Sequence, residues 1–308
     1  MDNPEHKPAS ELLEQFINYL HYERQYSKYT QRNYHQAIRD FLAWHSKYNT
    51  GNASLTSITS KILRDYVIES QKTLSRRTLH NHISAIRAFF QYLLKHKHLV
   101  SNPAIGIPLP KVEKMLPKFL TEKQIALLLQ SPLTMLKNEE ISPFEAWRDR
   151  LVLELIYGGG LRVSEAANLN YSDVNFADGT ARIIGKGNKE RICPLGKVAL
   201  ACLKHFQSIF APESIATDAI LLGNNKKRIQ ISGIQKLIKN HLRFSNLPQD
   251  ITPHKIRHSF ATHMLNHGAD LRLLQELLGH SSLSSTQVYT HVDSLKLKQI
   301  HQKAHPRG

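Results

Sequence analysis

Six residues of the kinds that handle phosphate esters follow one another along the C-terminal half of the sequence. They are Arg162, Lys186, His254, Arg257, His280 and Tyr289. A phenolate forms a phosphoester that is readily reversed, so Tyr289 is the candidate nucleophile. Guanidinium groups present paired donors to phosphate and stay charged, which suits the two arginines as a clamp. The set favours phosphodiester cleavage that needs neither a metal ion nor another cofactor.

The other three residues suit proton transfer. Lys186 is placed to protonate a leaving 5′-oxygen, His254 to accept the tyrosine proton, and His280 to donate to a phosphate oxygen. Taken singly, two of the six have simpler interpretations. Arg162 would be a surface arginine, and Lys186 an edge-strand lysine that discourages aggregation. The hypothesis therefore depends on all six occurring together.

Helical patterns hold the C-terminal members of the set. His254 and Arg257 lie three apart in a segment of helical periodicity, which puts both on one side of a helix. A second helix, predicted over residues 271–278, ends at Gly279, a residue suited to a left-handed cap. His280 follows that cap, so we expect it to project from a helix end.

Arg162 and Lys186 are predicted to lie on turns. A buried helix over residues 147–157 stops at three glycines, and Arg162 follows, before a short helix with Ser164 as its expected N-cap. The segments VNF, TARIIG and KERICPL then predict a small antiparallel sheet, with Lys186 in a glycine-flanked hairpin turn. Further helices are expected over residues 197–210 and 232–244.

The chain is predicted to be mainly α-helical, with that one small sheet, and to have two domains. Residues 1–100 carry four helical patterns, the first with Ser10 as its expected N-cap, and form a helical DNA-binding domain. Residues 101–118, rich in proline, predict an extended linker, and residues 119–308 a catalytic domain opening on a capping box at Thr121. The candidate phosphate contacts outside the catalytic set are Arg76, Arg77, Lys226, Lys227 and Arg228.

Charge and composition point to a polyanionic partner. Lys and Arg outnumber Asp and Glu by 41 to 25, which favours double-stranded DNA over a membrane surface, although a merely soluble basic protein is the simpler alternative. No apolar run reaches the ~20 residues of a membrane span, and no signal peptide is recognisable. The two cysteines form no metal or redox pair, so we expect a reducing, cytoplasmic location.

Five motifs together resemble the tyrosine recombinases of the Xer type, a branch of the phage integrase family. They are GLRVSEAANL, GKGNKER, PHKIRHSFATHML, LLGHSSLSSTQVYTHV and AHPR, and the resemblance covers nearly the whole chain. The family's catalytic positions fall on the six residues named above, and Glu165 matches a position that supports the first arginine. The resemblance implies an N-terminal SAM-like domain and DNA cleavage to a 3′-phosphotyrosine, followed by attack of the partner strand's 5′-hydroxyl.

The linker, the sequence Arg148-Asp149-Arg150 and the closing AHPR favour the XerC branch of that family over the XerD branch. The resemblance then implies a heterotetramer with an XerD-like recombinase that resolves chromosome dimers before cell division, with a cell-division DNA translocase as a possible activator. Subunits of the family exchange C-terminal helices, which would explain the weakly apolar tail over residues 295–300. Disorder is the alternative for that tail.

Other functions remain open on the residues alone. An XerD-like subunit, a mobile-element integrase and a type IB topoisomerase share the tyrosine chemistry. A non-catalytic DNA-binding regulator would need neither Tyr289 nor Lys186. The pairs His254/His258 and His263/His267 suggest a metal-dependent hydrolase, but they lack neighbouring acidic ligands.

Overall fold

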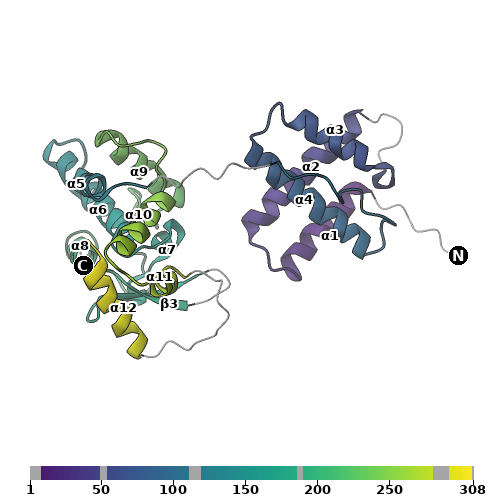
Figure 1. The fold of residues 1–308 in the computed structure, drawn as a ribbon. Helices are drawn as coiled ribbons and strands as arrows, with labels where there is room; N and C mark the ends of the chain where they lie inside the picture. Colours follow the sequence, from purple (N-terminus) through teal and green to yellow (C-terminus); the bar gives the residue numbers. More distant parts are fainter. Residues whose placement is uncertain (1–7, 49–53, 111–118, 186–189, 280–290, 307–308) are drawn as a thin grey trace. The chain divides into compact units, whose positions relative to one another are not determined.

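The chain divides into two compact units, residues 1–115 and 116–308. The computed structural model describes residues 8–48, 54–110, 119–185, 190–279 and 291–306, the last range with side chains from residue 297 onward. Most of the regular structure is helical, with one three-stranded sheet (Figure 1). In the described ranges, no helix combines the length and the apolar character that a membrane crossing requires.

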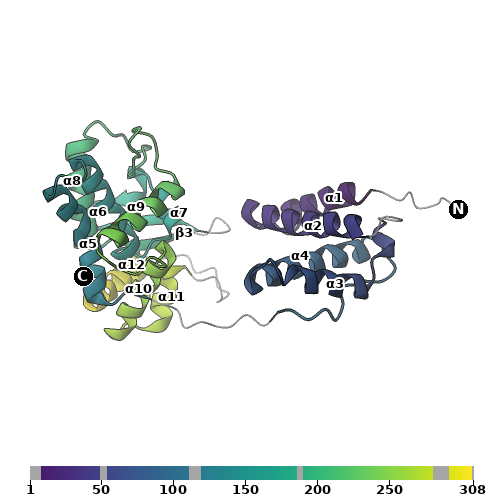
Figure 2. The same cartoon turned by 90° about the horizontal axis from the view of Figure 1, so that it is seen from above.

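In the described part of the N-terminal unit, four α-helices lie in two layers. These are α1 (Ala9–Tyr22), α2 (Lys28–Tyr48), α3 (Ser60–Ser70) and α4 (Arg76–Lys95), with a 3₁₀ turn at Leu55–Ser57. Figure 2 shows α1 and α2 in one layer and α3 and α4 in the other. Aromatic side chains fill the space between the layers, with Phe16, Phe41, Phe89 and Phe90 at most 1% exposed. Burial of these rings, each worth a few kcal/mol, holds the unit together.

Side-chain caps begin several of the helices, among them the one predicted at Thr121, but not the first helix. Ser75 accepts a hydrogen bond from the Thr78 amide at the start of α4. Thr121 and Gln124 form the expected capping box. The expectation that Ser10 caps α1 was wrong: the helix already begins at Ala9, after Pro8, whose fixed φ leads the chain into the first turn.

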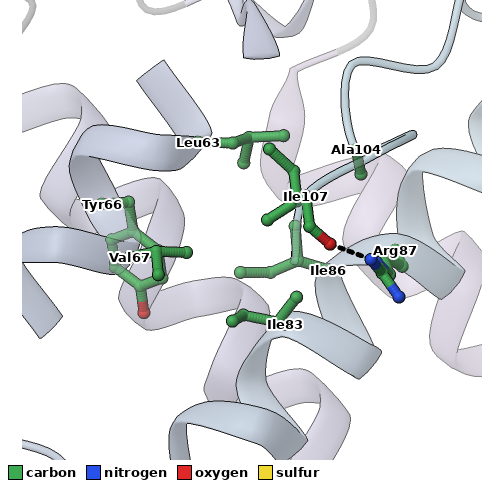
Figure 3. A pocket seen from close by; sticks show the side chains of 8 residues that line it. All are labelled: Leu63, Tyr66, Val67, Ile83, Ile86, Arg87, Ala104 and Ile107. Carbon is green, nitrogen blue, oxygen red and sulfur yellow. Dashed lines mark hydrogen bonds between the residues drawn. The ribbon is translucent and has the colours of Figure 1, made fainter. Parts of the chain in front are cut away.

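The first half of the segment expected to be a linker is folded onto the N-terminal unit. Ala104 and Ile107 are 3% and 2% exposed, and Ile107 closes a small apolar pocket between α3 and α4 (Figure 3). Arg87 donates a hydrogen bond to the carbonyl of Ile107, and Ser60 Oγ donates to Pro103 O at 2.8 Å. The expectation of an extended linker from residue 101 therefore does not hold for residues 103–107, because two apolar side chains without periodicity suffice to dock the chain.

The second unit is built around one buried helix. Helix α6 (Pro143–Tyr157) is buried on nearly all sides, and Leu151 to Ile156 are at most 1% exposed. Around it pack α5 (Glu122–Lys137), α7 (Val163–Asn168), α8 (Lys197–Phe210), α9 (Ile231–Phe244) and α10 (Pro253–Asn266). The helix ends at Gly158, and its carboxyl end thus lies in the core, where it fixes the turn that carries Arg162.

The small sheet lies beside this core. Strands β1 (Val174–Asn175), β2 (Thr180–Ile184) and β3 (Glu190–Pro194) pair antiparallel in that order. The register opposes Ala181 to Cys193 and Ile183 to Arg191. All four of these residues are buried, so one face of the hairpin packs inward and Arg191 lies on that face.

The sequence Arg148-Asp149-Arg150 has a structural role inside α6. Asp149 Oδ2 lies 2.9 Å from Nε2 of His241 on α9, and Nδ1 of that histidine lies 3.0 Å from the hydroxyl of Ser131 on α5. All three residues are at most 5% exposed. This serine–histidine–aspartate chain is closed off from solvent, and it ties three helices together rather than presenting a nucleophile.

Helix α12 (His291–Ala304) packs against its own catalytic unit, and the expected alternative of a disordered tail does not hold for residues 297–305. Leu297, His301 and His305 are at most 6% exposed. His301 Nε2 lies 2.6 Å from Gly158 O, and the two imidazoles stack at 4.7 Å. Phe260 lies against both rings. Two histidines thus add to the packing that Leu297 and Ala304 provide.

Docking of α12 is expected to weaken as the pH falls below about 6.5. Burial lowers the pKa of His301, so the docked state holds the ring neutral. The stabilisation is complete above the unfolded pKa and is lost as the pH falls toward the folded pKa. Hydrogen exchange of residues 297–305 should show less protection at pH 5.5 than at pH 7.5. His301→Gln keeps a donor for Gly158 O without titrating, and we expect it to reduce the pH dependence; an unchanged dependence would assign the effect to other groups.

Candidate active site

Three of the six predicted catalytic residues lie within the described ranges, and two of them meet at one carboxylate. Glu165 on α7 accepts hydrogen bonds from Arg162 Nη1 at 2.7 Å and from Arg257 Nη1 at 3.4 Å. It also accepts from the backbone amide of Arg162 at 2.8 Å. The expectation that Glu165 supports the first arginine agrees with this geometry. Lys186, His280 and Tyr289 lie outside the described residues.

The turn after α6 positions Arg162. Gly160 adopts a left-handed φ of +60°, and a Cβ there would lie 2.6 Å from the ring of Phe260, so the chain can turn at this point only with glycine. The N-cap of α7 is Arg162 itself, and not Ser164 as expected, because Glu165 reaches back to the Arg162 amide. The guanidinium is thereby fixed at both its backbone and its side chain, and about a third of its side chain remains exposed.

Arg257 lies deeper, on α10. Its guanidinium donates to the carbonyls of Gly160 and Leu278 as well as to Glu165. Burial and the neighbouring charge of Arg162 lower the pKa of Arg257 to about 10, so it is still charged at neutral pH. His254 lies one turn earlier on the same helix and is exposed. The guanidinium of Arg257 is therefore buried in the cluster, whereas His254 is exposed to solvent.

A third arginine, which the sequence analysis did not assign, completes the cluster. Arg191 on β3 is 5% exposed and binds Glu165 in a bidentate manner, with Nη1–Oε1 and Nη2–Oε2 distances of 2.9 and 2.7 Å. Arg191 lies two residues before Cys193, and alternate residues of a strand face the same side. A charged residue on the same face as an expected core residue is the sequence feature that could have identified it. Burial raises the pKa of the Cys193 thiol to about 11, so it stays neutral beside the arginines.

The Glu165 carboxylate is the electrostatic centre of the site. Burial alone would raise its pKa, but the hydrogen bonds and charge of Arg191 and the hydrogen bonds of Arg162 bring it down to about 2. It is therefore ionised at any physiological pH. Three guanidinium charges against one carboxylate leave a net positive cluster, which suits an anionic phosphodiester.

The carboxyl end of α11 (Leu271–Leu278) joins this cluster. Its last carbonyls and that of Gly279 each accept from a different arginine: Leu277 from Arg191, Leu278 from Arg257 and Gly279 from Arg162. Gly279 has φ 63° and ψ 51°, the left-handed cap that the sequence predicted. The helix end that precedes His280 in the sequence is thus bound directly to the arginine cluster.

The five basic residues predicted to contact DNA differ in whether their side chains are exposed or already bound within the protein. Arg76 and Arg77 are exposed in the first turn of α4, and Lys227 is exposed in the loop before α9. Lys226 instead lies 3.9 Å above the ring of Phe144. Arg228 donates to Ala167 O at 3.0 Å and Asn170 Oδ1 at 2.6 Å, which makes it part of the local fold.

One of the two histidine pairs considered as metal ligands, His263 and His267, has protein partners. His263 Nδ1 lies 2.9 Å from the hydroxyl of Tyr157, and His267 pairs with Glu122 at 3.6 Å. Among the residues that the structure describes, no three His, Cys, Asp or Glu side chains gather closely enough to hold a metal ion. Both cysteines are buried and unbridged.

Comparison with known proteins places the two units in one family. Residues 118–296 match the phage integrase family, and residues 13–97 match its N-terminal SAM-like domain. Tyrosine recombinase XerC of Histophilus somni is 39% identical, covering 96% of this chain and 98% of its own, and XerD of Yersinia pestis is 37% identical, covering 100% and 99%. The fold matches XerH bound to its difH substrate, with a TM-score of 0.68, 24% identity and 97% and 90% coverage. The chain therefore belongs to the phage integrase family and is a site-specific DNA recombinase of the Xer tyrosine-recombinase type.

Proposed function

We propose that Arg162 and Arg257, both held by Glu165, bind the scissile phosphate of a recombination site, where Tyr289 attacks it. The phenolic oxygen forms a bond to phosphorus, the 5′-oxygen leaves, and the DNA strand becomes a 3′-phosphotyrosyl adduct. A 5′-hydroxyl of the partner strand then reverses the step and releases the tyrosine. One phosphodiester replaces another, so the exchange requires no nucleotide cofactor.

The observation that carries this proposal is the placement of two arginines on one carboxylate. Arg162 keeps a third of its side chain exposed while its position is fixed, and a fixed donor stabilises a developing charge without reorganising. We assign proton transfer to the leaving oxygen to Lys186, acceptance of the tyrosine proton to His254, and a phosphate contact to His280. The attachment of Gly279 to Arg162 supports the last assignment, because it links the residue before His280 to the phosphate site.

We assign DNA binding to both units, with residues 1–100 as the core-binding domain. Exposed basic residues at the start of α4 and in the loop before α9 suit phosphate contacts, and Lys227 is the best placed of the loop residues. The outward face of α9 carries Gln235, Lys236, Lys239, Asn240 and Arg243. Such side chains pair with base edges as well as with phosphates, so this helix suits the major groove.

The biological setting proposed is the XerC role in the cytoplasm, together with an XerD-like partner, in resolving chromosome dimers at cell division. Relatives of similar identity include both XerC and XerD proteins, so the branch is a matter for site-binding experiments. We further propose that α12, docked in cis in the isolated chain, is exchanged between subunits in the tetramer, and that a DNA translocase activates the complex.

Covalent trapping on a nicked DNA substrate tests the chemistry. With chelator present, the wild-type protein should form an adduct that survives denaturation, and mass spectrometry should locate it on the peptide containing Tyr289. Tyr289→Phe should bind the same DNA and form no adduct. An adduct on another residue, or cleavage that requires added metal, would overturn the mechanism. An XerD-like protein is included in parallel reactions, so that activation by a partner is also scored.

A further inference from the structure

The buried arginine of β3 makes contacts that neither the sheet nor the core requires. All of the Arg191 contacts named above go to the active-site cluster: both carboxylate oxygens of Glu165, and Leu277 O at 3.0 Å. A Cβ added at Gly279 would lie 3.1 Å from its Cδ, so the guanidinium stem packs directly beneath the cap of α11. A side chain that merely filled the core would be apolar, because burying a charge is costly unless it is paired.

Arg191 and the two clamp arginines share their acceptors. Each of the three binds Glu165, and each binds one of the consecutive carbonyls of Leu277, Leu278 and Gly279. Helix carboxyl ends carry partial negative charge, so this backbone attracts all three guanidinium groups. Arg191 is deeply buried and occupies both carboxylate oxygens. Glu165 is consequently held in one orientation, and that orientation decides where Arg162 and Arg257 point.

We propose that Arg191 is a positioning residue for recombination: it orients Glu165 and the carboxyl end of α11 so that Arg162 and Arg257 bind the scissile phosphate together. The residue acts through its neighbours and does not touch the DNA. Arg191 also lies five positions after Lys186 in the sequence, so the proposal joins β3, on the C-terminal side of that lysine, to the arginine clamp. The inference rests on the proposed function, since it gives Arg191 a part in the step that the clamp catalyses.

The central experiment measures single-turnover cleavage on saturating DNA as a function of pH. Arg191→Met removes the charge and the donors while retaining an apolar stem of similar length. We expect cleavage at neutral pH to fall by roughly 10–100-fold, by analogy with the loss when residues that orient metal ligands are replaced. DNA affinity should change by less than about threefold, since the partly exposed Arg162 remains.

The pH profile separates positioning from a merely structural role. Among the residues that the structure describes, the charged and titratable groups that face Glu165 are Arg162 at the N-cap of α7, Arg191 from β3 and Arg257 from α10, with the Cys193 thiol beside them. Without Arg191, burial raises the pKa of Glu165 and two arginines alone oppose it. Arg191→Met should therefore lose activity on the acid side at a higher pH than wild type. Adding Glu165→Gln to Arg191→Met should remove that additional acid-side loss, because no carboxylate is left to titrate.

Two further variants keep the test decisive. Arg191→Lys retains one charge and should recover part of the rate, so it serves if the methionine variant fails to fold. Arg182→Met is the matched control. It removes a half-exposed arginine of the neighbouring strand that pairs weakly with Asp173 and Glu190, and the variant should cleave at the wild-type rate.

Cleavage by Arg191→Met within about twofold of wild type, or a uniform loss with an unchanged pH profile, would overturn the proposal. Failure of the tyrosine mechanism would look different, because wild type itself would then form no adduct.

Discussion

Arg257→Lys is expected to lower the rate of covalent adduct formation by roughly 10²–10³-fold, with DNA binding largely retained. The wild-type guanidinium donates to Gly160 O, Leu278 O and Glu165, and its planar fork reaches all three at once. A lysine ammonium is a compact group that cannot span these acceptors and still address a phosphate. The charge survives the change, so the loss measures geometry rather than electrostatic attraction.

The measurement is single-turnover trapping on a nicked substrate at saturating DNA, so that binding and cleavage are separated. Arg182→Lys makes the same substitution at a half-exposed arginine of β2, and we expect it to leave the rate unchanged within about twofold. A melting temperature for Arg257→Lys close to that of wild type shows that the cluster still folds. If the lysine variant forms adduct within about threefold of the wild-type rate, Arg257 is not a phosphate clamp.

The local elements of this site were predictable from the sequence because each depends on neighbours in the chain. The left-handed cap at Gly279 needed only a glycine after an apolar helix, and the structure confirms it. Helix α8 has the predicted bounds, since its periodicity is complete and the preceding Gly196 marks its start. The three strands likewise follow from short apolar segments separated by turn residues.

Features set by tertiary contact were not predictable in this way. Arg191 was missed because a lone arginine in a strand is usually exposed, and only the partner carboxylate, 26 positions away, makes its burial favourable. Ile107 docks into a pocket formed by two helices, a contact without local periodicity. The rings of His301 and His305 pack against Phe260, and His301 also forms a hydrogen bond with Gly158 O. In each of these cases the decisive partner is distant in the chain.

Glu165→Gln is expected to reduce the free energy of unfolding of the catalytic unit by roughly 3–5 kcal/mol at neutral pH. The substitution is nearly isosteric, but it removes the carboxylate that pairs with both Arg191 and Arg257. The buried guanidinium groups of Arg191 and Arg257 would then repel one another, because no carboxylate charge would lie between them. The pKa of about 2 for Glu165, against an ordinary 4.5, corresponds to roughly 3 kcal/mol, in the same range.

The two tryptophans, Trp44 and Trp147, make the measurement specific to one unit. In a Trp44→Phe background, Trp147 on α6, whose ring lies 3.9 Å from that of His205, reports the catalytic unit alone during urea unfolding. Glu190→Gln, at a half-exposed carboxylate whose ion pair with Arg182 spans 3.6 Å, is the matched control and should cost less than about 1 kcal/mol.

The sign of the pH dependence gives a second criterion for Glu165. Its folded pKa is lowered, so the stabilisation is complete above pH 4.5 and is lost as the pH falls toward 2. The difference in stability between the wild-type protein and the Glu165→Gln variant should therefore be constant from pH 7 to pH 5 and shrink between pH 4 and pH 3. A difference that stays constant down to pH 3 would mean that the carboxylate acts through shape alone. A shrinking difference would identify charge pairing with the three arginines as the force that holds the phosphate site in place.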